Sequence, residues 1–414
     1  MLLFLLIFCF SFAHSQKQYS DHTYLIFKST QENLNFRSNL YKDETLDFLQ
    51  RSPQIDADNV IFLKPDQIEQ TRQRFQREKI AFELEDVPHF DYPTPREDNK
   101  RISRRSLTDF KLTAFNDVDE QVAFMKSLAK KHSDFVELEV FGKSAQGKPL
   151  YLLKIGYPLN GTKKSGVFID ANIHAREWIT SSTAFWIINE LVTNSTHKDL
   201  LTKVDVYVVP MLNPDGYMWS RKRDRMWRRN RNHFSSNSES DCVGVDLNRN
   251  FPFHWSPRDI DFVPDQCHQN YPGPEPGSEE ETKSLMKVLK RLSTLRAYIA
   301  LHSRGDLILY PWGFAKNHLP PDVHVLIEMA HKIRAGIFSS RGNNFTVLNS
   351  ADMYLAAGIA HDYAKSSGIK YSYTLELTKI REYRPTEAEI EPVGREVFAG
   401  ILVLLQDIFL EILL

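Results

Sequence analysis

Residues 165–180 read SGVFIDANIHAREWIT, and this stretch indicates the fold class. An apolar, strand-like run, SGVFIDA, leads through a polar turn into the helical stretch EWITSSTAFWIINELVTN at 177–194. A strand followed by a helix is the building unit of an α/β sheet. In such sheets, sites collect beyond the carboxyl ends of the strands, so the polar residues after SGVFIDA are candidates for chemistry.

The same alternation continues along the chain. Further strand-like runs are LYLLKIGY, VDVYVVPMLN, LRAYIALHS, DLILYPWG and IKYSYTLELT, and EEETKSLMKVLKRLS is a second helical stretch. Several of the strands are apolar on both faces, which predicts a sheet buried between helix layers. From about Ser106 onward we therefore expect one α/β domain with a central mixed sheet.

The chain ends in an apolar run, VFAGILVLLQDIFLEILL, at 397–414. Gln406, Asp407 and Glu411 interrupt it, which argues against a membrane span or a lipid-anchor signal. Thr386 and Glu389 have the spacing of a capping box. The run is therefore predicted to be a final amphipathic helix that packs on the core.

The first part of the chain differs from the rest. Residues 1–15, MLLFLLIFCFSFAHS, resemble a secretory signal, since a membrane anchor needs roughly 20 apolar residues. Residues 16 to about 95 alternate strand-like and helix-like stretches and predict a small α+β unit. A linker rich in proline and charge follows.

The linker carries a basic pair, Arg104 and Arg105, directly before Ser106. A basic pair taken alone is more often a solvated charge run than a processing site. Its position between two folded units nevertheless favours cleavage near Arg105 by a trypsin-like protease, which divides the chain into 16–105 and 106–414.

Composition and cysteine content favour the secretory route. The net charge is -1, from 52 Lys+Arg and 53 Asp+Glu, so we expect no nucleic-acid partner and no anionic membrane surface as a partner. Cys9 would leave with the signal, and an even pair of cysteines in an exported chain suggests one disulfide. Three glycosylation acceptors fit the same compartment: Asn160, Asn194 and Asn344.

Two histidines and a glutamate follow the ends of strand-like runs. His174 and Glu177 are three residues apart, but such a pair arises readily by chance among 14 histidines, with Glu177 as a helix-capping residue. His302 ends LRAYIALHS, where a lone histidine is usually a satisfied core residue. Together the three supply zinc-ligand types and leave a fourth position open for water, as catalytic zinc sites do.

At this point the chain resembles the carboxypeptidase A/B family of zinc carboxypeptidases. The resemblance rests on seven ordered matches: HAREW at 174–178, MWRRN at 226–230, CVGVDLNRN at 242–250, ALHS at 300–303, ILYPWG at 308–313, Tyr354 followed by Asp362, and TLEL at 374–377. It implies an eight-stranded mixed sheet with helices on both faces, one Zn²⁺ on His174, Glu177 and His302, and a Cys242–Cys267 disulfide. It also implies that residues 16–105 are an activation segment that covers the active site, and that the partners are peptide or protein C-termini.

The resemblance assigns roles to further residues. Glu376 matches the general base, although a strand-end carboxylate is often only a salt-bridge partner. Arg228 matches the cation that stabilises the transition state, yet RKRDRMWRRNR at 221–231 is by itself a basic surface stretch in which either Arg228 or Arg229 could turn inward. The implied substrate-binding residues are Arg176, Asn248, Arg249 and Tyr354, with Arg249 forking the terminal carboxylate.

Two positions depart from the usual family pattern. Arg304 replaces a tyrosine of a secondary subsite, which favours acidic or extended substrates or is a solvated variant. His361 falls by register on the floor of the side-chain pocket, with Asn349 nearby. A buried ammonium would lack a partner there, so we expect aromatic or aliphatic C-terminal residues first, with acidic ones as the alternative.

Two other kinds of function compete with a secreted, monomeric exopeptidase. One is an inactive relative that only binds peptides, which the presence of ligands, base and carboxylate fork disfavours. The other is a zinc amidohydrolase on the same sheet, which would need no terminal-carboxylate clamp beside Arg228. The clamp therefore discriminates between the hydrolases.

Overall fold

A computed structural model of the 414-residue chain describes two lobes of unequal size. It describes residues 22–41, 43, 46–50, 55–56, 58–86, 110–159, 163–233, 242–255, 265–379, 383 and 385–413. The predicted signal peptide, the linker with Arg104 and Arg105, and Asn160 lie outside these residues.

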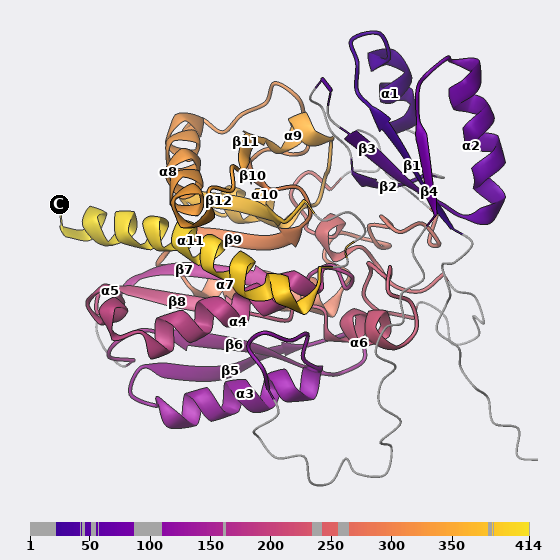
Figure 1. The fold of residues 1–414 in the computed structure, drawn as a ribbon. Helices are drawn as coiled ribbons and strands as arrows, with labels where there is room; N and C mark the ends of the chain where they lie inside the picture. The colour runs from indigo at the N-terminus through magenta and orange to yellow at the C-terminus, as the bar shows by residue number, and fades with distance from the viewer. Residues whose placement is uncertain are drawn as a thin grey trace, which may run out of the picture.

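The larger lobe is built on an eight-stranded mixed sheet, which confirms the expected fold class (Figure 1). The strand order is β11-β10-β12-β9-β7-β8-β6-β5, with parallel pairing from β12 through β9 and β7 to β8 and antiparallel pairing of β10 with β12, β6 with β8 and β5 with β6. The strands are β5 Val136–Lys143, β6 Pro149–Ile155, β7 Ser165–Ala171, β8 Val204–Val209, β9 Leu295–Ser303, β10 Leu307–Tyr310, β11 Thr346–Asn349 and β12 Tyr371–Leu377.

Helices cover both faces of this sheet, as predicted from the strands that carry apolar residues on both faces. The larger core joins one face to α3 Val118–Lys131, α4 Trp178–Thr193, α8 Val323–Arg341 and α11 Ile390–Leu413. A second core joins the other face to α7 Glu280–Arg291 and α10 Ala360–Ser366. Shorter elements connect them: η1 Ser195–His197, α5 Lys198–Leu201, α6 Pro214–Lys222, η2 Leu247–Arg249, α9 Ser350–Met353 and η4 Glu387–Glu389.

The C-terminal run lies in α11, and the predicted capping box caps η4, which leads directly into α11. The Thr386 amide donates to the Glu389 carboxylate at 2.6 Å, and the Glu389 amide donates to the Thr386 carbonyl at 3.1 Å. The helix packs along α8 and α4 with Ile401, Leu404 and Leu405 fully buried. Among the helices that the structure describes, none has both the length and the apolar character needed to cross a membrane.

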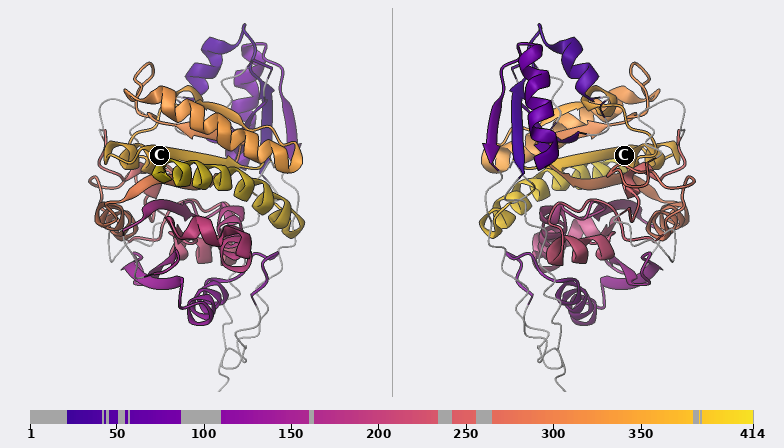
Figure 2. Two further views of the ribbon diagram at one scale, coloured as in Figure 1. Left: turned by 90° about the vertical axis from the view of Figure 1, so that its left-hand side faces the viewer. Right: turned by 90° about the vertical axis from the view of Figure 1, so that its right-hand side faces the viewer.

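The smaller lobe is a four-stranded antiparallel sheet with two helices (Figure 2). Its elements are β1 Thr23–Lys28, α1 Leu34–Tyr41, β2 Asp47–Gln50, β3 Asp58–Leu63, α2 Pro65–Arg77 and β4 Glu83–Asp86, in the strand order β2-β3-β1-β4. Both strands and helices are present, as expected for a small α+β unit, but α1 and β2 lie in a polar segment whose pattern did not predict them.

The two faces of the small sheet bury different partners, because successive residues of a strand point to opposite sides. Leu25 and Phe27 of β1 pack with Phe75 of α2 in the core of the small lobe. Tyr24 and Ile26 point the other way, into a cluster that also contains Val60, Phe62, Met226 and Tyr383. The second face of the sheet therefore packs on the larger lobe.

Candidate metal centre and active site

His174, Glu177 and His302 converge at the carboxyl ends of β7 and β9, which are neighbouring parallel strands. His302 lies within β9, and His174 lies in the turn between β7 and α4. Glu177 occupies the N-cap position of α4, but its side chain makes no capping bond. Its carboxylate instead lies 2.8 Å from His174 Nδ1 and 3.2 Å from His302 Nδ1.

These three residues fit a zinc ion. One ligand atom from each lies within 4.8 Å of the others, and all three residues are buried. Two imidazole nitrogens and one carboxylate are the donors of many catalytic zinc sites. Burial raises the pKa of Glu177, but His174 and His302 lower it by more, so the carboxylate stays ionised, as a ligand must be.

Asp246, which the sequence analysis did not identify, connects the metal ligands to the rest of the site. Its carboxylate lies 3.1 Å from His174 Nε2 and accepts a hydrogen bond from Arg228 Nε at 2.9 Å. It also accepts one from the Asn248 amide at 2.9 Å. Burial raises the pKa of Asp246, but Arg228 and His174 hold it well below its ordinary value. A carboxylate behind a ligating histidine fixes the orientation of the imidazole ring.

Glu376 lies beside the metal ligands because β12 pairs in parallel with β9, with Glu376 directly opposite His302. It lines the same pocket as the three ligands. Burial and the neighbouring Glu177 carboxylate raise the pKa of Glu376 to about 8. A bound dication would favour the charged form and oppose this shift.

Of the two candidate arginines, Arg228 turns toward the ligands. Its Nη1 lies 3.1 Å from His174 Nδ1 and 3.9 Å from Glu177 Oε1. Burial lowers the pKa of Arg228, but Asp246, Tyr354, Glu177 and Tyr383 together raise it by more, so the guanidinium stays charged. The stretch around it is not a solvated surface, since Arg225, Arg229 and Arg231 are also buried.

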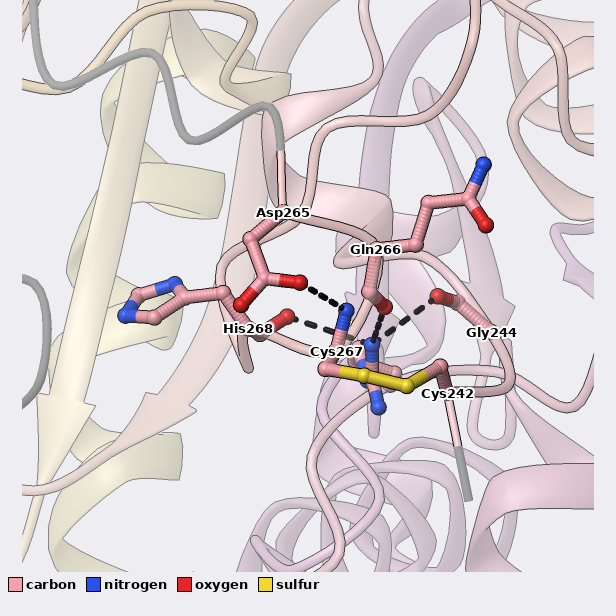
Figure 3. Close-up of a disulfide and its surroundings, with 7 residues drawn as sticks. Cys242, Gly244, Asp265, Gln266, Cys267 and His268 are labelled. Carbon is pink, nitrogen blue, oxygen red and sulfur yellow. Dashed lines mark hydrogen bonds between the residues drawn. A yellow bond between two sulfur atoms is a disulfide. The ribbon is translucent and has the colours of Figure 1, made fainter. Parts of the chain in front are cut away.

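Arg229 points instead toward the disulfide that joins Cys242 and Cys267. It donates to the carbonyl oxygens of Gly244, Gln266 and His268 at 3.4, 2.5 and 3.2 Å, the atoms drawn around the disulfide in Figure 3. Burial and the neighbouring Arg231 cation lower the pKa of Arg229 to about 10. Arg229 therefore ties the loop next to Arg228 to the disulfide-closed segment.

Arg249 and Tyr354 form a second polar group in the pocket. Arg249 Nη2 donates to the Tyr354 hydroxyl at 3.3 Å, and Nη1 donates to the Asn248 carbonyl at 2.8 Å. The Asn248 amide nitrogen lies 3.4 Å from His302 Nε2, and its side-chain oxygen accepts from the Ala360 amide at 2.8 Å. The chain thus brings a guanidinium and a phenol together next to the metal ligands.

Arg176 and Arg304 line the remaining part of the same pocket. The Arg176 guanidinium is 4.4 Å from the centre of the Tyr383 ring, and the Arg304 guanidinium is 5.6 Å from it. Arg176 also donates to Gln269 at 3.2 Å. Arg304 is therefore a buried pocket residue and not a solvated variant.

His361 and Asn349 do not line this pocket within the described part of the chain. His361 lies at the start of α10, with Nδ1 2.8 Å from Thr374 Oγ1 and Nε2 3.2 Å from Asp362 Oδ1. Asn349 caps α9 by accepting from the Ala351 amide at 3.2 Å and donates to the Tyr310 carbonyl at 3.3 Å. The polar atoms of Asn349 are thus engaged by the backbone.

Comparisons with known proteins agree on one family. A family model described as zinc carboxypeptidase matches residues 121–400. Carboxypeptidase B from Astacus astacus is 38% identical over 297 residues, which are 70% of this chain and 96% of the relative. Human carboxypeptidase O is 32% identical over 321 residues, which are 75% of this chain and 83% of the relative.

A solved structure extends the similarity to both lobes. The crystal structure of carboxypeptidase A from Helicoverpa armigera superposes with a TM-score of 0.83 and 25% identity. The match covers 94% of this chain and 97% of that chain.

Proposed function

This chain belongs to the zinc carboxypeptidase family, and we propose that it is a secreted precursor whose active form releases single aromatic or aliphatic residues from peptide C-termini. Membership itself establishes a zinc-dependent hydrolase that acts on C-terminal residues. Secretion, the precursor form, the residue roles and the side-chain preference are the proposal. The observation that carries it is a single pocket holding His174, Glu177 and His302 together with a carboxylate, Glu376, and a carboxylate-binding arginine, Arg249.

The metal ligands would be His174 Nδ1, one Glu177 oxygen and His302 Nδ1. Zinc held there polarises a carbonyl and lowers the pKa of water to about 7. The role of the protein is to keep His174 oriented through Asp246 and to leave one side of the ligand group open to the pocket.

Glu376 is the proposed general base. It would take a proton from the attacking water and return one to the leaving amine, which requires the ionised form at the start of the reaction. Its burial in the same pocket as the metal ligands supports this role, and a bound dication would favour the ionised form that the role requires. Its position opposite His302 supports reach to the reacting atoms.

Arg228 is the proposed stabiliser of the negative charge that develops on the scissile carbonyl oxygen. A fixed guanidinium aimed at the metal ligands stabilises the transition state more than the neutral substrate. Its bond to Asp246 supports this role, because the side chain needs no rearrangement when the charge appears.

The free C-terminal carboxylate would bind Arg249, with Asn248 and Tyr354 beside it. An arginine fork binds a carboxylate through two parallel hydrogen bonds, which gives exopeptidase rather than endopeptidase action. The contact of Arg249 with the Tyr354 hydroxyl supports closure of the phenol over the same group. Arg176 would hold residues farther from the C-terminus.

The N-terminal lobe is the proposed activation segment. Phe48 of β2 lines the pocket together with the metal ligands, and the second face of the small sheet packs on Met226 and Tyr383. A lobe in this position would obstruct long substrates until cleavage near Arg105 releases it. Export is supported by the apolar residues 1–15, by the disulfide, and by Asn344, an exposed acceptor motif.

The proposed preference for aromatic or aliphatic residues rests on the family register, which puts His361 at the floor of a side-chain pocket although it is not part of the pocket lining described above, and on the charge around His361. Its Nε2 lies 3.2 Å from the buried Asp362 carboxylate, so an imidazolium there would be neutralised within the protein. Such a floor attracts neither a cation nor an anion strongly. Acidic C-terminal residues remain the second candidate.

The test uses the full-length precursor loaded with zinc, before and after limited trypsin treatment. We expect trypsin to cut near Arg105 and the product to release one residue at a time from a peptide, as mass spectrometry of the peptide would record. Chelation should abolish release and added zinc should restore it. An uncut peptide would support the peptide-binding alternative, and hydrolysis of an N-acyl substrate lacking a free carboxylate would support the amidohydrolase.

A further inference from the structure

We propose that Asn230 is a positioning residue that fixes the direction in which Arg228 points. Within the described residues Asn230 does not line the pocket, so it would act only through the loop that carries Arg228. This inference rests on the proposed function, because Arg228 is the proposed stabiliser of the charge on the scissile carbonyl oxygen.

The Asn230 side chain is fully buried, and each of its hydrogen-bonding groups has a partner. Its Nδ2 donates to Glu279 Oε2 at 2.7 Å and to Glu281 Oε2 at 3.1 Å. Its Oδ1 accepts from the Val245 amide at 2.8 Å and from the Asn232 amide at 3.4 Å. An amide side chain has two donor hydrogens and one oxygen with two lone pairs, so its whole capacity is used.

Two carboxylates make a displacement of Asn230 unfavourable. Glu279 and Glu281 are both fully buried at the start of α7. Their other oxygens accept from the Ser278 hydroxyl at 2.7 Å and from the Ala145 amide at 2.9 Å, respectively. A buried carboxylate is destabilising unless it is hydrogen-bonded, and a shift of Asn230 would take one donor from each of the two. The start of α7 therefore holds Asn230 in place.

Asn230 connects the loop that carries Arg228 to the loop that carries Asp246. Its backbone amide donates to the Val245 carbonyl at 3.0 Å, so residues 230 and 245 are joined by a backbone and a side-chain hydrogen bond. One residue beyond Val245, the Asp246 carboxylate accepts from Arg228 Nε at 2.9 Å. Asn230 thus sets the spacing of the two backbones from which Arg228 and Asp246 reach each other.

The two loops touch without a side chain between them. Gly244 has φ +85°, and a Cβ built there would lie 2.2 Å from the Asn230 carbonyl oxygen. Glycine is the residue that tolerates both this conformation and this approach. A movement of Asn230 would therefore be passed to the neighbouring backbone and not absorbed by a flexible side chain.

A separate contact holds the Arg228 loop to the metal-binding segment. The Ala175 amide donates to the Arg228 carbonyl at 3.0 Å, and Ala175 directly follows the ligand His174. This bond involves only backbone atoms, so it remains when the Asn230 side chain is removed. Loss of that side chain should therefore misdirect Arg228 while the loop stays next to the metal ligands.

The experiment is a double-mutant cycle on the trypsin-treated, zinc-saturated protein, with kcat and KM measured for one peptide. We expect Asn230→Ala to lower kcat about 10–100-fold and to change KM less than about twofold, because a misdirected group affects the transition state alone. Arg228→Gln should lower kcat about 10²–10³-fold. The double variant should match Arg228→Gln within about twofold, since two residues that act through one contact are not additive.

The cycle separates positioning from support of the fold. If Asn230→Ala lowers kcat by the same factor with and without Arg228, or leaves kcat unchanged, the inference is overturned while the proposed function stands. If Arg228→Gln leaves kcat unchanged, the proposed role of Arg228 is wrong, and the inference is overturned with it.

Asn232→Ala is the matched control. Asn232 Nδ2 donates to the same Glu279 oxygen at 3.0 Å, and the bond from the Gly244 amide to the Asn232 carbonyl is retained in alanine. The variant therefore removes a donor from Glu279 but keeps the connection between the loops, and kcat should stay within about twofold. A loss equal to that of Asn230→Ala would contradict a specific role for Asn230.

A pair of variants at Glu279 keeps the inference testable if Asn230→Ala does not fold. Glu279→Gln can still accept from Asn230, because its new amide group can donate to the Ser278 hydroxyl, so kcat should be kept. Glu279→Ala removes the acceptor and should lower kcat about fivefold with little change in KM. Equal kcat in the two Glu279 variants would overturn the inference.

Discussion

The metal end of the pocket and the proposed side-chain end, which lies beyond the described pocket lining, use polar groups differently. At the metal end, defined here as His174, Glu177, Asp246, His302 and Glu376, charged atoms face one another and the space where a substrate would react. At the side-chain end, defined as Asn349, His361 and Thr374, they are engaged by neighbouring side chains and backbone groups.

This difference predicts different kinds of defect. A substitution at the metal end removes charge from the reacting atoms and should lower kcat. A substitution at the side-chain end changes which C-terminal residue fits, and should shift kcat/KM between substrates. Three substitutions test this separation.

The largest effect is expected from Glu376→Gln. The variant keeps the shape of the side chain but cannot accept a proton, so kcat should fall by about 10³-fold while zinc stays bound. Turnover of one peptide and metal content by atomic emission measure the two quantities. Glu328→Gln is the control, because the Glu328 side chain is 71% exposed on α8 and should have no effect. Undiminished turnover in Glu376→Gln would mean that another group is the base.

The same variant also tests the raised pKa of Glu376, through the pH dependence of the stability of the metal-free precursor. The pKa of Glu376 is raised from 4.5 to about 8, so between these pH values the folded protein binds more protons than the unfolded chain. Stability is then lost as pH rises through this window, by linkage. Glu376→Gln should flatten that part of the pH profile of thermal unfolding, and an identical profile would contradict the shift.

A smaller effect is expected from Asp246→Asn. The amide cannot hold the His174 imidazole and the Arg228 guanidinium as the carboxylate does, so zinc affinity should fall by about 10–100-fold. At saturating zinc, kcat should still be reduced because Arg228 loses its charged partner. Competition with a chelator measures the affinity. Full recovery of kcat at saturating zinc would show that Asp246 supports only zinc binding through His174 and does not act through Arg228.

The smallest effect is expected from His361→Ile. Aliphatic and aromatic C-terminal residues should gain a few-fold in kcat/KM relative to Glu, since the apolar side chain removes the imidazole from the pocket floor. A panel of peptides that differ only in the C-terminal residue measures this ratio. An equal fall in kcat for every peptide would instead show that His361 contributes to the reaction step, as the residues at the metal end are proposed to do.

Much of the fold was readable from the sequence because the central strands are apolar on both faces. β7, β8, β9 and β12 each appear as an apolar run. The edge strands are harder to recognise: β5 is largely half-exposed, and β11 has only four residues. The count of eight strands therefore came from family resemblance and not from hydrophobic pattern.

The candidate site was readable only in part. His174 and His302 lie at strand ends, where such residues are expected. Asp246 carries no comparable signal, because its importance depends on the chain bringing it to His174 and Arg228, which are 72 and 18 residues away. The choice between Arg228 and Arg229 also needed coordinates, since adjacent identical residues differ only in the direction that the folded loop gives them.

The pairing of β9 with β12 fixes the distance between the backbones of His302 and Glu376, independently of their side chains. His302 and Glu376 are opposite one another in the ladder, so about 4.8 Å of interstrand spacing separates their backbones. A slip of one residue would turn Glu376 to the other face of the sheet and remove it from the pocket. Asn349, at the end of β11, and His361, in α10, lie outside this ladder. Substitutions at Asn349 or His361 are therefore expected to change the range of accepted C-terminal residues without changing the spacing between His302 and Glu376.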